Sequence, residues 1–255
     1  MKQIVAPVIS NVEVMPETYL IWLECPDVAA EARPGQFVMV NCGEDCYLPR
    51  PLSIHRTDVG KLALLFKIVG KGTEWLSQQK TGNTLNIFGP LGNGFYINPD
   101  AHNLLLVAGG IGIAPIRFLA DAANKQSKNI TLLMGAQQAV QHLSNELLPS
   151  PMKLVISTDD GSMGKKGPAT LSIPNEANRA DQVFACGPVG MYRAMAQMPE
   201  LKNKPVQVSL EIRMACGVGV CYSCTIKTRK GLKQVCKDGP VFELEDIIWE
   251  GMGGV

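Results

Sequence analysis

Residues 2–95 alternate apolar and polar positions over short runs that Pro and Gly interrupt. Representative runs are LIWL at 20–23, QFVMV at 36–40 and LALLFKIV at 62–69. Successive side chains of a β-strand point to opposite faces, so a period of two is typical of strands with one buried face. Many short strands separated by turns predict an antiparallel barrel or sandwich for this part of the chain.

The pattern changes after Pro99, where a continuous apolar run at 103–108 leads into a glycine-rich turn and a helical stretch to about Ala123. Further buried strands are predicted, with helical segments between them, at 130–134, 152–157 and 182–185. Apolar strands alternating with helices are typical of a parallel α/β sheet.

From about Pro205 the chain carries a third, small unit that contains a group of cysteines. We therefore predict a multidomain β plus α/β protein with an N-terminal antiparallel β-barrel, a central parallel α/β domain and a small C-terminal domain. The predicted boundaries are 1–98, 99–204 and 205–255.

Composition agrees with an ordinary globular chain: 255 residues, 46% of them hydrophobic, and a net charge of +1. A net charge so close to neutral gives no sign of the strongly basic surface that nucleic-acid-binding proteins carry. The chain has no apolar run of 18 residues, and its N-terminus lacks the apolar segment of a secretory signal, so we expect no membrane span and a cytoplasmic location. Eight cysteines fit a reducing compartment better than a disulfide framework, given how four of them are spaced.

The C-terminal cysteines follow the spacing C-x4-C-x2-C-x11-C and are Cys216, Cys221, Cys224 and Cys236. This spacing is typical of a plant-type [2Fe–2S] site, which moves single electrons. Gly217 and Gly219 lie inside the loop. Without a Cβ they can take positive φ, so that backbone N–H groups point inward toward the negative charge of the cluster.

A structural zinc site and disulfides are the two alternatives to a [2Fe–2S] cluster for these cysteines. A structural zinc site also takes four cysteines, but it usually has two C-x2-4-C pairs, and this stretch has one. Disulfides are the weakest alternative. We therefore predict the four cysteines as ligands of a [2Fe–2S] cluster.

Gly109, Gly110 and Gly112 lie where a predicted strand passes into a helix. Such a turn lets the backbone approach a pyrophosphate closely. The motif is not the strict G-x-G-x-x-G, so a tight turn without a ligand remains an alternative. A second segment, Cys186-Gly187-Pro188, also follows a buried strand, and ligands collect at the ends of parallel strands.

The predicted barrel contains Arg50-Pro-Leu-Ser53, followed by Gly70-Lys-Gly-Thr73. An arginine can bind a phosphate through two hydrogen bonds, and a nearby hydroxyl can bond a flavin ring nitrogen. Taken alone, these residues fit a surface ion pair and a turn equally well.

In this order the three elements resemble the ferredoxin–NADP reductase superfamily. More narrowly, the chain resembles the family of electron-transfer subunits of NAD-dependent dihydroorotate dehydrogenase, over essentially its whole length. The motifs that carry this resemblance are Arg50–Ile54, Gly109–Pro115, Ser157–Gly161, Cys186–Pro188 and, most specifically, Cys216–Cys236 followed by KDGPVF.

The resemblance implies an oxidoreductase relay in pyrimidine biosynthesis. A separate FMN-containing catalytic subunit would oxidise dihydroorotate, and electrons would pass through the [2Fe–2S] cluster and FAD to NAD. The expected assembly is a heterotetramer with two copies of each subunit. The chain itself offers no acid–base set for pyrimidine chemistry, because its three histidines are scattered.

The resemblance also assigns residues. Arg50 would hold the FAD pyrophosphate, Ser53 would lie near flavin N5, and the remaining predicted FAD contacts are Pro51, Leu52, Lys67, Ile68, Val69, Gly72 and Thr73. Predicted NAD contacts are Gly109, Gly110, Gly112, Asp159 and Gly187. Ser53 and Cys186 are the predicted catalytic residues, with Cys186 expected near nicotinamide C4 and flavin N5.

The pair Asp159-Asp160 bears on the choice of nucleotide. Acidic residues at a strand end disfavour a 2′-phosphate and can bond a ribose hydroxyl, which favours NAD over NADP. Two turn-forming aspartates before Gly161 are the plain alternative, and the nearby Lys165 and Lys166 oppose the electrostatic argument.

Two other functions stay open. A related NAD(P)H-linked reductase subunit could serve a ferredoxin-linked or sulfide-linked partner with similar flavin and nucleotide domains. A zinc-bearing binding module on a degraded reductase scaffold would have no enzymatic role and would be colourless.

Overall fold

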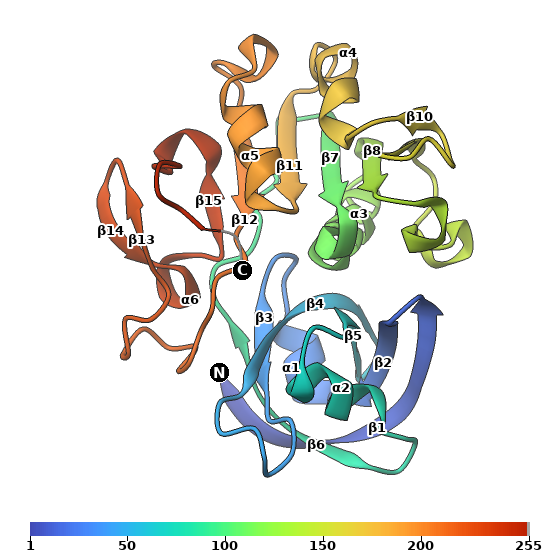
Figure 1. Ribbon diagram of the computed structural model, residues 1–255, viewed down its shortest axis with the longest axis vertical. Helices are drawn as coiled ribbons and strands as arrows, with labels where there is room; N and C mark the ends of the chain where they lie inside the picture. Colours follow the sequence, from blue (N-terminus) through green and yellow to red (C-terminus); the bar gives the residue numbers. More distant parts are fainter. Residues whose placement is uncertain (254–255) are drawn as a thin grey trace.

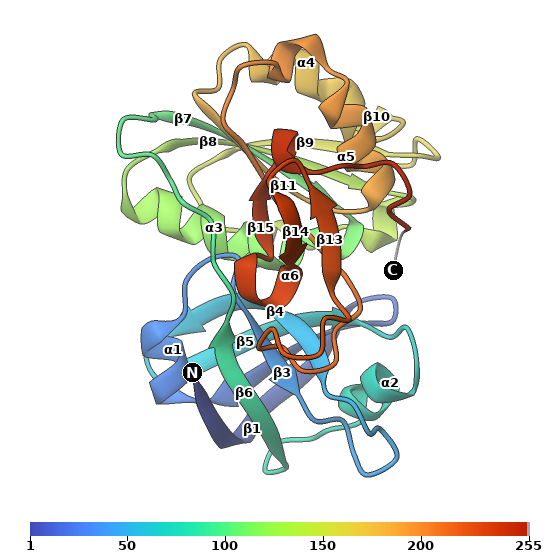
Figure 2. The same ribbon diagram turned by 90° about the vertical axis from the view of Figure 1, so that its left-hand side faces the viewer.

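The computed structural model describes residues 1–253 and consists of two halves, one above the other in Figure 1. A barrel forms the lower half and a sheet flanked by helices forms the upper half, as Figure 1 shows. The last part of the chain runs alongside both halves, and Figure 2 shows it in front of the junction between them.

The lower half is a closed barrel with strand order β1-β2-β5-β4-β3-β6, in which every pairing is antiparallel. Its strands are β1 (Lys2–Met15), β2 (Thr18–Glu24), β3 (Phe37–Val40), β4 (Arg50–Asp58), β5 (Lys61–Lys67) and β6 (Thr84–Leu91). Two short helices cover it, α1 (Pro26–Glu31) and α2 (Lys71–Ser77). Alternate apolar residues, such as Val38 and Val40, fill the interior, so the two-residue period correctly predicted a barrel.

The upper half is a seven-stranded sheet in the order β10-β9-β8-β7-β11-β12-β15. Its strands are β7 (Asn103–Gly109), β8 (Asn129–Ala136), β9 (Lys153–Thr158), β10 (Lys165–Lys166), β11 (Gln182–Cys186), β12 (Val206–Ser209) and β15 (Val241–Glu243). All pairings are parallel except β12 with β15.

Helices cover both faces of this sheet. They are α3 (Ile113–Lys125) on one face and α4 (Ile173–Ala177) with α5 (Val189–Ala196) on the other. Along β7, Leu104 and Leu106 pack on the α3 side while Leu105 and Val107 pack on the α5 side. A strand buried on both faces has to be apolar throughout, which explains the continuous run in the sequence.

Short 3-10 turns connect many of the elements: η1 (Gly110–Gly112), η2 (Ala139–Gln141), η3 (Asn145–Leu147), η4 (Ala169–Ser172), η5 (Pro199–Leu201) and η6 (Leu244–Asp246). Across residues 1–253, every helix is too short or too polar to cross a lipid bilayer.

The C-terminal unit contains the hairpin β13 (Thr225–Thr228) and β14 (Gly231–Gln234), followed by α6 (Val235–Asp238). Two strands of the third predicted segment, β12 and β15, join the central sheet. The predicted fold class is confirmed, while the boundaries at 98 and 204 stay predictions.

The barrel and the sheet are joined through a buried histidine. His55 of β4 is 1% exposed, and its Nδ1 lies 3.0 Å from the carbonyl oxygen of Ala114 in α3. Burial, with the nearby Arg117 guanidinium, lowers the pKa of His55 to about 3. The imidazole is therefore neutral at pH 7, and its Nδ1–H donates to Ala114.

We expect this histidine to make stability depend on pH between about 6.5 and 3, because its pKa falls from 6.5 to about 3 on folding. In that window the unfolded chain binds a proton that the folded chain rejects, so stability falls as pH falls. The slope from one such group is at most about 1.4 kcal/mol per pH unit. His55→Gln replaces the imidazole N–H donor with an amide N–H donor that does not titrate. It should therefore flatten the dependence of unfolding free energy on pH, measured by urea unfolding between pH 7 and pH 5. Parallel profiles for the two proteins would contradict this assignment.

Candidate functional site

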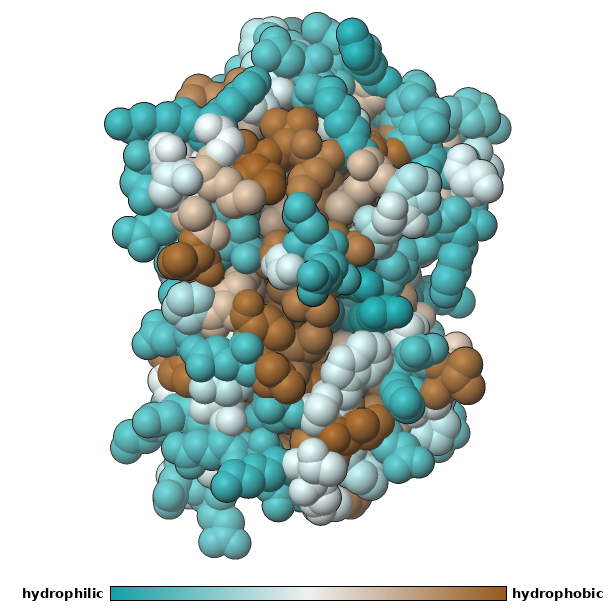
Figure 3. Space-filling model, turned by 90° about the vertical axis from the view of Figure 1, so that its right-hand side faces the viewer, coloured by the Kyte–Doolittle hydropathy of each residue, from teal (hydrophilic) through white to brown (hydrophobic). Residues whose placement is uncertain are grey.

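A cleft of about 670 Å³ lies between the barrel and the sheet. The barrel contributes Met15, Pro16, Thr18 and Lys67, and the sheet contributes the loops at the carboxyl ends of its parallel strands. On the face shown in Figure 3, apolar side chains gather between the upper and lower halves of the molecule. The volume is in the range of small-molecule and cofactor sites.

The predicted nucleotide glycines meet at this cleft, and those that line it are Gly109, Gly110, Gly112 and Gly187. A Cβ on Gly112 would lie 2.1 Å from the carbonyl oxygen of Cys186. A Cβ on Gly187 would lie 3.1 Å from the Cα of Gly109. The two glycine turns are therefore packed backbone to backbone, and larger residues would push them apart.

The Cys186 side chain lies behind these turns. It is 0% exposed and packs among Phe184 and Ile113 on the α3 side of the sheet. Burial raises the pKa of the thiol well above its usual value. The backbone of Cys186 thus packs against Gly112, while its sulfur lies away from the cleft surface.

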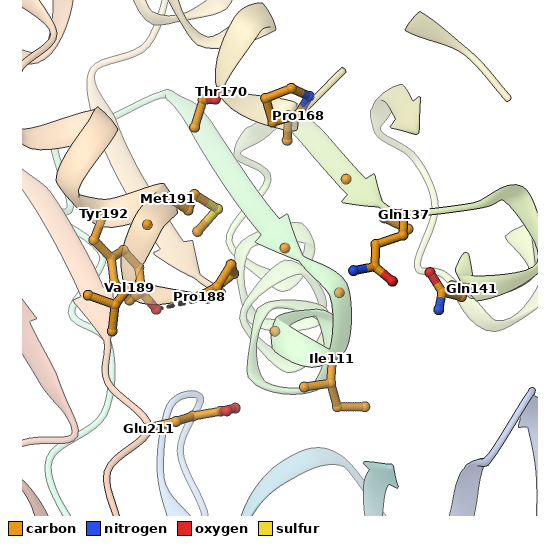
Figure 4. Close-up of a pocket in the computed structure, with 18 of the residues that line it drawn as sticks. Ile111, Gln137, Gln141, Pro168, Thr170, Pro188, Val189, Met191, Tyr192 and Glu211 are labelled. Carbon is orange, nitrogen blue, oxygen red and sulfur yellow. Dashed lines mark hydrogen bonds between the residues drawn. The ribbon is translucent and has the colours of Figure 1, made fainter. Parts of the chain in front are cut away.

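Tyr192 fixes the second glycine turn. Its hydroxyl donates to the Ser209 carbonyl oxygen at 2.6 Å and accepts from the Gly187 N–H at 2.8 Å, the bond drawn in Figure 4. Burial raises the pKa of Tyr192 well above its usual value, so the phenol stays protonated. The end of β11 is thereby tied to the end of β12.

Glu211 follows β12 and lines the cleft below Pro188 and Val189 in Figure 4. Its side chain is exposed to the cleft, and desolvation by the surrounding protein raises the pKa of its carboxyl group. Our sequence analysis missed it. An acidic residue within two positions of the end of a buried strand, close to the signal used for Asp159, would have found it.

The two adjacent aspartates have different surroundings. Asp159 lines the cleft, whereas the Asp160 carboxylate accepts hydrogen bonds from Ser162 N at 2.9 Å and Ser162 Oγ at 2.6 Å. These bonds lower the pKa of Asp160. Asp160 therefore forms the turn, while Asp159 lies at the cleft and its binding of a ribose hydroxyl stays a prediction.

Two glutamines at the end of β8 were also missed. Gln137 and Gln141 line the cleft, and Figure 4 shows their side chains near one another on the side opposite Tyr192. Lys165 and Lys166 are exposed in β10, where Lys166 lies opposite Thr158, the residue before Asp159. The lysines do not themselves line the cleft, whereas two amides and a carboxylate do.

The barrel motif brings Arg50 and Gly72 together. A Cβ on Gly72 would lie 2.8 Å from Arg50 Nε, so the arginine side chain packs directly against this glycine. Thr73 is buried, and its hydroxyl accepts from Val69 N at 2.9 Å and donates to Gly70 O at 3.0 Å. That hydroxyl is thus engaged in shaping the loop.

The other predicted flavin residues are spread along β4 and β5. Pro51, Leu52 and Ser53 are each half-buried, while Lys67 lines the cleft. Ile68 donates its N–H to the Glu17 carbonyl oxygen, and Val69 is 82% exposed.

The four cysteines lie in two pairs. Cys224 and Cys236 are buried with their sulfurs 3.3 Å apart, whereas Cys216 is half-buried and Cys221 is exposed. Within residues 1–253, no three His, Cys, Asp or Glu side chains converge on one position for a single metal ion. A two-iron cluster needs two thiolates for each iron, so paired cysteines fit it.

Backbone donors surround the sulfurs. Gly219 N donates to Cys236 Sγ at 3.1 Å and Val218 N to Cys216 Sγ at 3.5 Å. The positive φ predicted for both loop glycines is confirmed, with +72° at Gly217 and +82° at Gly219. These residues would hold a [2Fe–2S] cluster and stabilise its negative charge.

Comparisons with known proteins agree with this geometry. The iron–sulfur cluster binding domain of dihydroorotate dehydrogenase B matches residues 211–248. The electron transfer subunit of dihydroorotate dehydrogenase B (NAD(+)) from Desulforamulus reducens is 40% identical over 256 aligned residues, which cover 96% of this chain and 98% of the relative. The same subunit from Clostridium acetobutylicum is 41% identical over 220 residues, covering 86% and 87%. The chain belongs to this family.

Solved structures support the fold. A solved structure of the NADH-dependent reduced ferredoxin-NADP oxidoreductase is similar to this chain, with a TM-score of 0.89 and 32% sequence identity. The match covers 97% of this chain and 91% of that chain. The ferredoxin reductase of carbazole 1,9a-dioxygenase, with a TM-score of 0.71 and 19% identity, covers 81% and 68% and shows the fold alone.

Membership of the family of dihydroorotate dehydrogenase B electron transfer subunits confirms the resemblance seen in the sequence. The predicted role, an electron-transfer subunit of an NAD-dependent oxidoreductase, is confirmed with it, as are the predicted cofactors FAD, [2Fe–2S] and NAD. The zinc-bearing binding module is not supported.

The contact between the glycine turns gives a test. Gly112→Ala should destabilise the protein by about 1–3 kcal/mol, because the new methyl group meets backbone that cannot rotate away. Gly190→Ala is the matched control, since a Cβ there has no neighbour within 4 Å. Urea unfolding of both variants measures the difference. Wild-type stability in Gly112→Ala would show that the turns are not packed as described.

Proposed function

We propose that this chain receives electrons from an FMN-containing catalytic subunit that oxidises dihydroorotate, and delivers them to NAD. The observation that carries the proposal is the C-x4-C-x2-C-x11-C loop, built into the same molecule as the nucleotide cleft. When bound, the [2Fe–2S] cluster passes single electrons and FAD collects two of them for hydride transfer.

In this proposal the flavin occupies the outer side of β4 and the adjacent cleft. Arg50 holds the FAD pyrophosphate, with Gly72 packed against the arginine side chain. Ser53 hydrogen-bonds near flavin N5, and the backbone of Lys67, Ile68 and Val69 contacts the cofactor. Pro51 lines this flavin site with its side chain and Leu52 with its backbone, because the Leu52 side chain packs toward the barrel interior. Thr73 holds the adjacent loop in shape.

NAD enters over the two glycine turns. Gly109, Gly110, Gly112 and Gly187 let the backbone approach the dinucleotide, and Cys186 shapes the hydride-transfer pocket from behind. Asp159 hydrogen-bonds a ribose hydroxyl and repels a 2′-phosphate. Asp159 lines the cleft, whereas Lys165 and Lys166 do not, and this supports NAD over NADP although both lysines lie on the strand next to β9.

The partner docks over the open side of the cysteine loop. Cys221 is exposed there, and its neighbours Val220 and Tyr222 are each 70% exposed, as is Leu232 of β14. Exposed apolar side chains beside a redox centre suit a protein interface. The proposed complex contains two copies of each subunit.

Two further assignments belong to this proposal. The segments 1–98, 99–204 and 205–255 serve as FAD-binding, NAD-binding and cluster-binding domains. The complex operates in the cytoplasm, a reducing compartment, in agreement with the absence of any disulfide among the eight cysteines, all of which lie in the described part of the chain.

The function is tested by using the full chain as bait under anaerobic conditions and adding dihydroorotate and NAD to the complex. We expect an FMN-containing subunit to co-purify, and NADH and orotate to form in equal amounts. The likeness to a ferredoxin-linked structure supplies the alternative. Normal FAD and iron–sulfur absorbance, with NADH formed from reduced ferredoxin but not from dihydroorotate, would move this chain to that function.

The flavin seat is tested with Ser53→Ala. We expect FAD to stay bound while its reduction by NADH slows about tenfold, the effect of losing one hydrogen bond worth about 1.4 kcal/mol. Stopped-flow absorbance of the flavin measures the rate. The control is Ser77→Ala, whose hydroxyl donates within α2. Equal rates in the two variants would remove Ser53 from the proposal.

A further inference from the structure

The cysteine loop is seated directly on the barrel. A Cβ on Gly217 would lie 2.7 Å from Met39 Cγ and 3.1 Å from Leu91 Cδ1. Met39 belongs to β3 and Leu91 to β6, and each is 2% exposed. The residue next to Cys216 therefore touches two buried side chains of the flavin-binding half of the molecule.

This seat is fixed by hydrogen bonds. Asn93, just after β6, donates its side-chain N–H groups to the carbonyl oxygens of Lys237 and Asp238, each at 3.1 Å, and its backbone N–H to Gly239 O at 2.6 Å. One continuous apolar cluster also includes Met39 together with Cys224 and Cys236. The distance from cysteine loop to barrel is thereby held constant.

Met39 also faces the proposed flavin seat. In the antiparallel pair β3–β4, Met39 lies opposite Pro51 and Phe37 lies opposite Ser53. Opposite residues of such a pair project from the same face, with Cβ atoms about 4.5–5.5 Å apart. Val38 and Val40 point into the barrel, so Met39 projects from its outer face beside Pro51.

We propose that Met39 bridges the cysteine loop and the flavin seat, and that it sets the rate of electron transfer between them. This inference rests on the proposed position of FAD at Arg50–Ser53. Each transfer oxidises the cluster by one electron and reduces the flavin by one, and Met39 itself neither gains nor loses an electron. Its role is to fill the gap with a polarisable side chain that contacts both sides.

Leu91 provides a matched comparison. It contacts the same glycine and is equally buried, but it lies opposite Phe37 on β6, one strand farther from the flavin motif. Truncating either residue removes packing beneath the cysteine loop. Only truncation of Met39 also opens a gap between that loop and Pro51.

The experiment compares Met39→Ala, Leu91→Ala and Met39→Leu in the holoenzyme. Cluster content and environment are checked by electron paramagnetic resonance, and redox titration gives both potentials. Stopped-flow mixing with NADH then separates flavin reduction from the later reduction of the cluster. We expect the second phase to slow by about tenfold or more in Met39→Ala, as for an ångström-scale separation of reacting centres. Met39→Leu and Leu91→Ala should stay within about twofold of wild type.

A wild-type second phase in Met39→Ala would overturn the proposal. Equal slowing in both alanine variants would also overturn it, because general loosening of the loop would then explain the effect. Failure of the flavin seat itself is a separate result, since it appears in the first phase and in the Ser53→Ala comparison.

Discussion

The pairing of β12 between β11 and β15 is the interaction on which the arrangement of the functional parts depends. On one side β12 continues the parallel sheet beside the second glycine turn, and on the other it joins the antiparallel β15 of the C-terminal unit. Its last residue, Ser209, accepts the Tyr192 hydrogen bond, and the chain then passes Glu211 on its way to Cys216. One buried strand thus positions the nucleotide cleft and the cysteine loop relative to each other.

Local patterns were enough to predict much of the fold. The alternation in residues 2–95 gave the barrel, and the spacing of the four cysteines gave the metal centre, because both patterns reflect geometry over a few residues. The joining of β12 and β15 was not predictable in this way. These strands are separated by more than 30 residues, and no local pattern of residues links them.

The site predictions were limited because the sequence does not show in which direction a side chain points. Residue type singled out Thr73, Cys186 and Asp159, but it did not show that the threonine hydroxyl and the thiol turn into the protein while Asp159 lines the cleft. Gln137 and Gln141 belong to no recognisable motif. They reach the cleft because the 3-10 turn after β8 brings them there.

The uneven burial of the four cysteines has a consequence for maturation. Cys224 and Cys236 lie in the apolar core, whereas Cys221 opens to solvent. The Cys221 side is therefore the most accessible side of the cysteine loop for iron and sulfide, and it is also the side proposed to receive the catalytic partner. If the partner docks there, it covers this access, so the inorganic core has to be assembled before the subunits join.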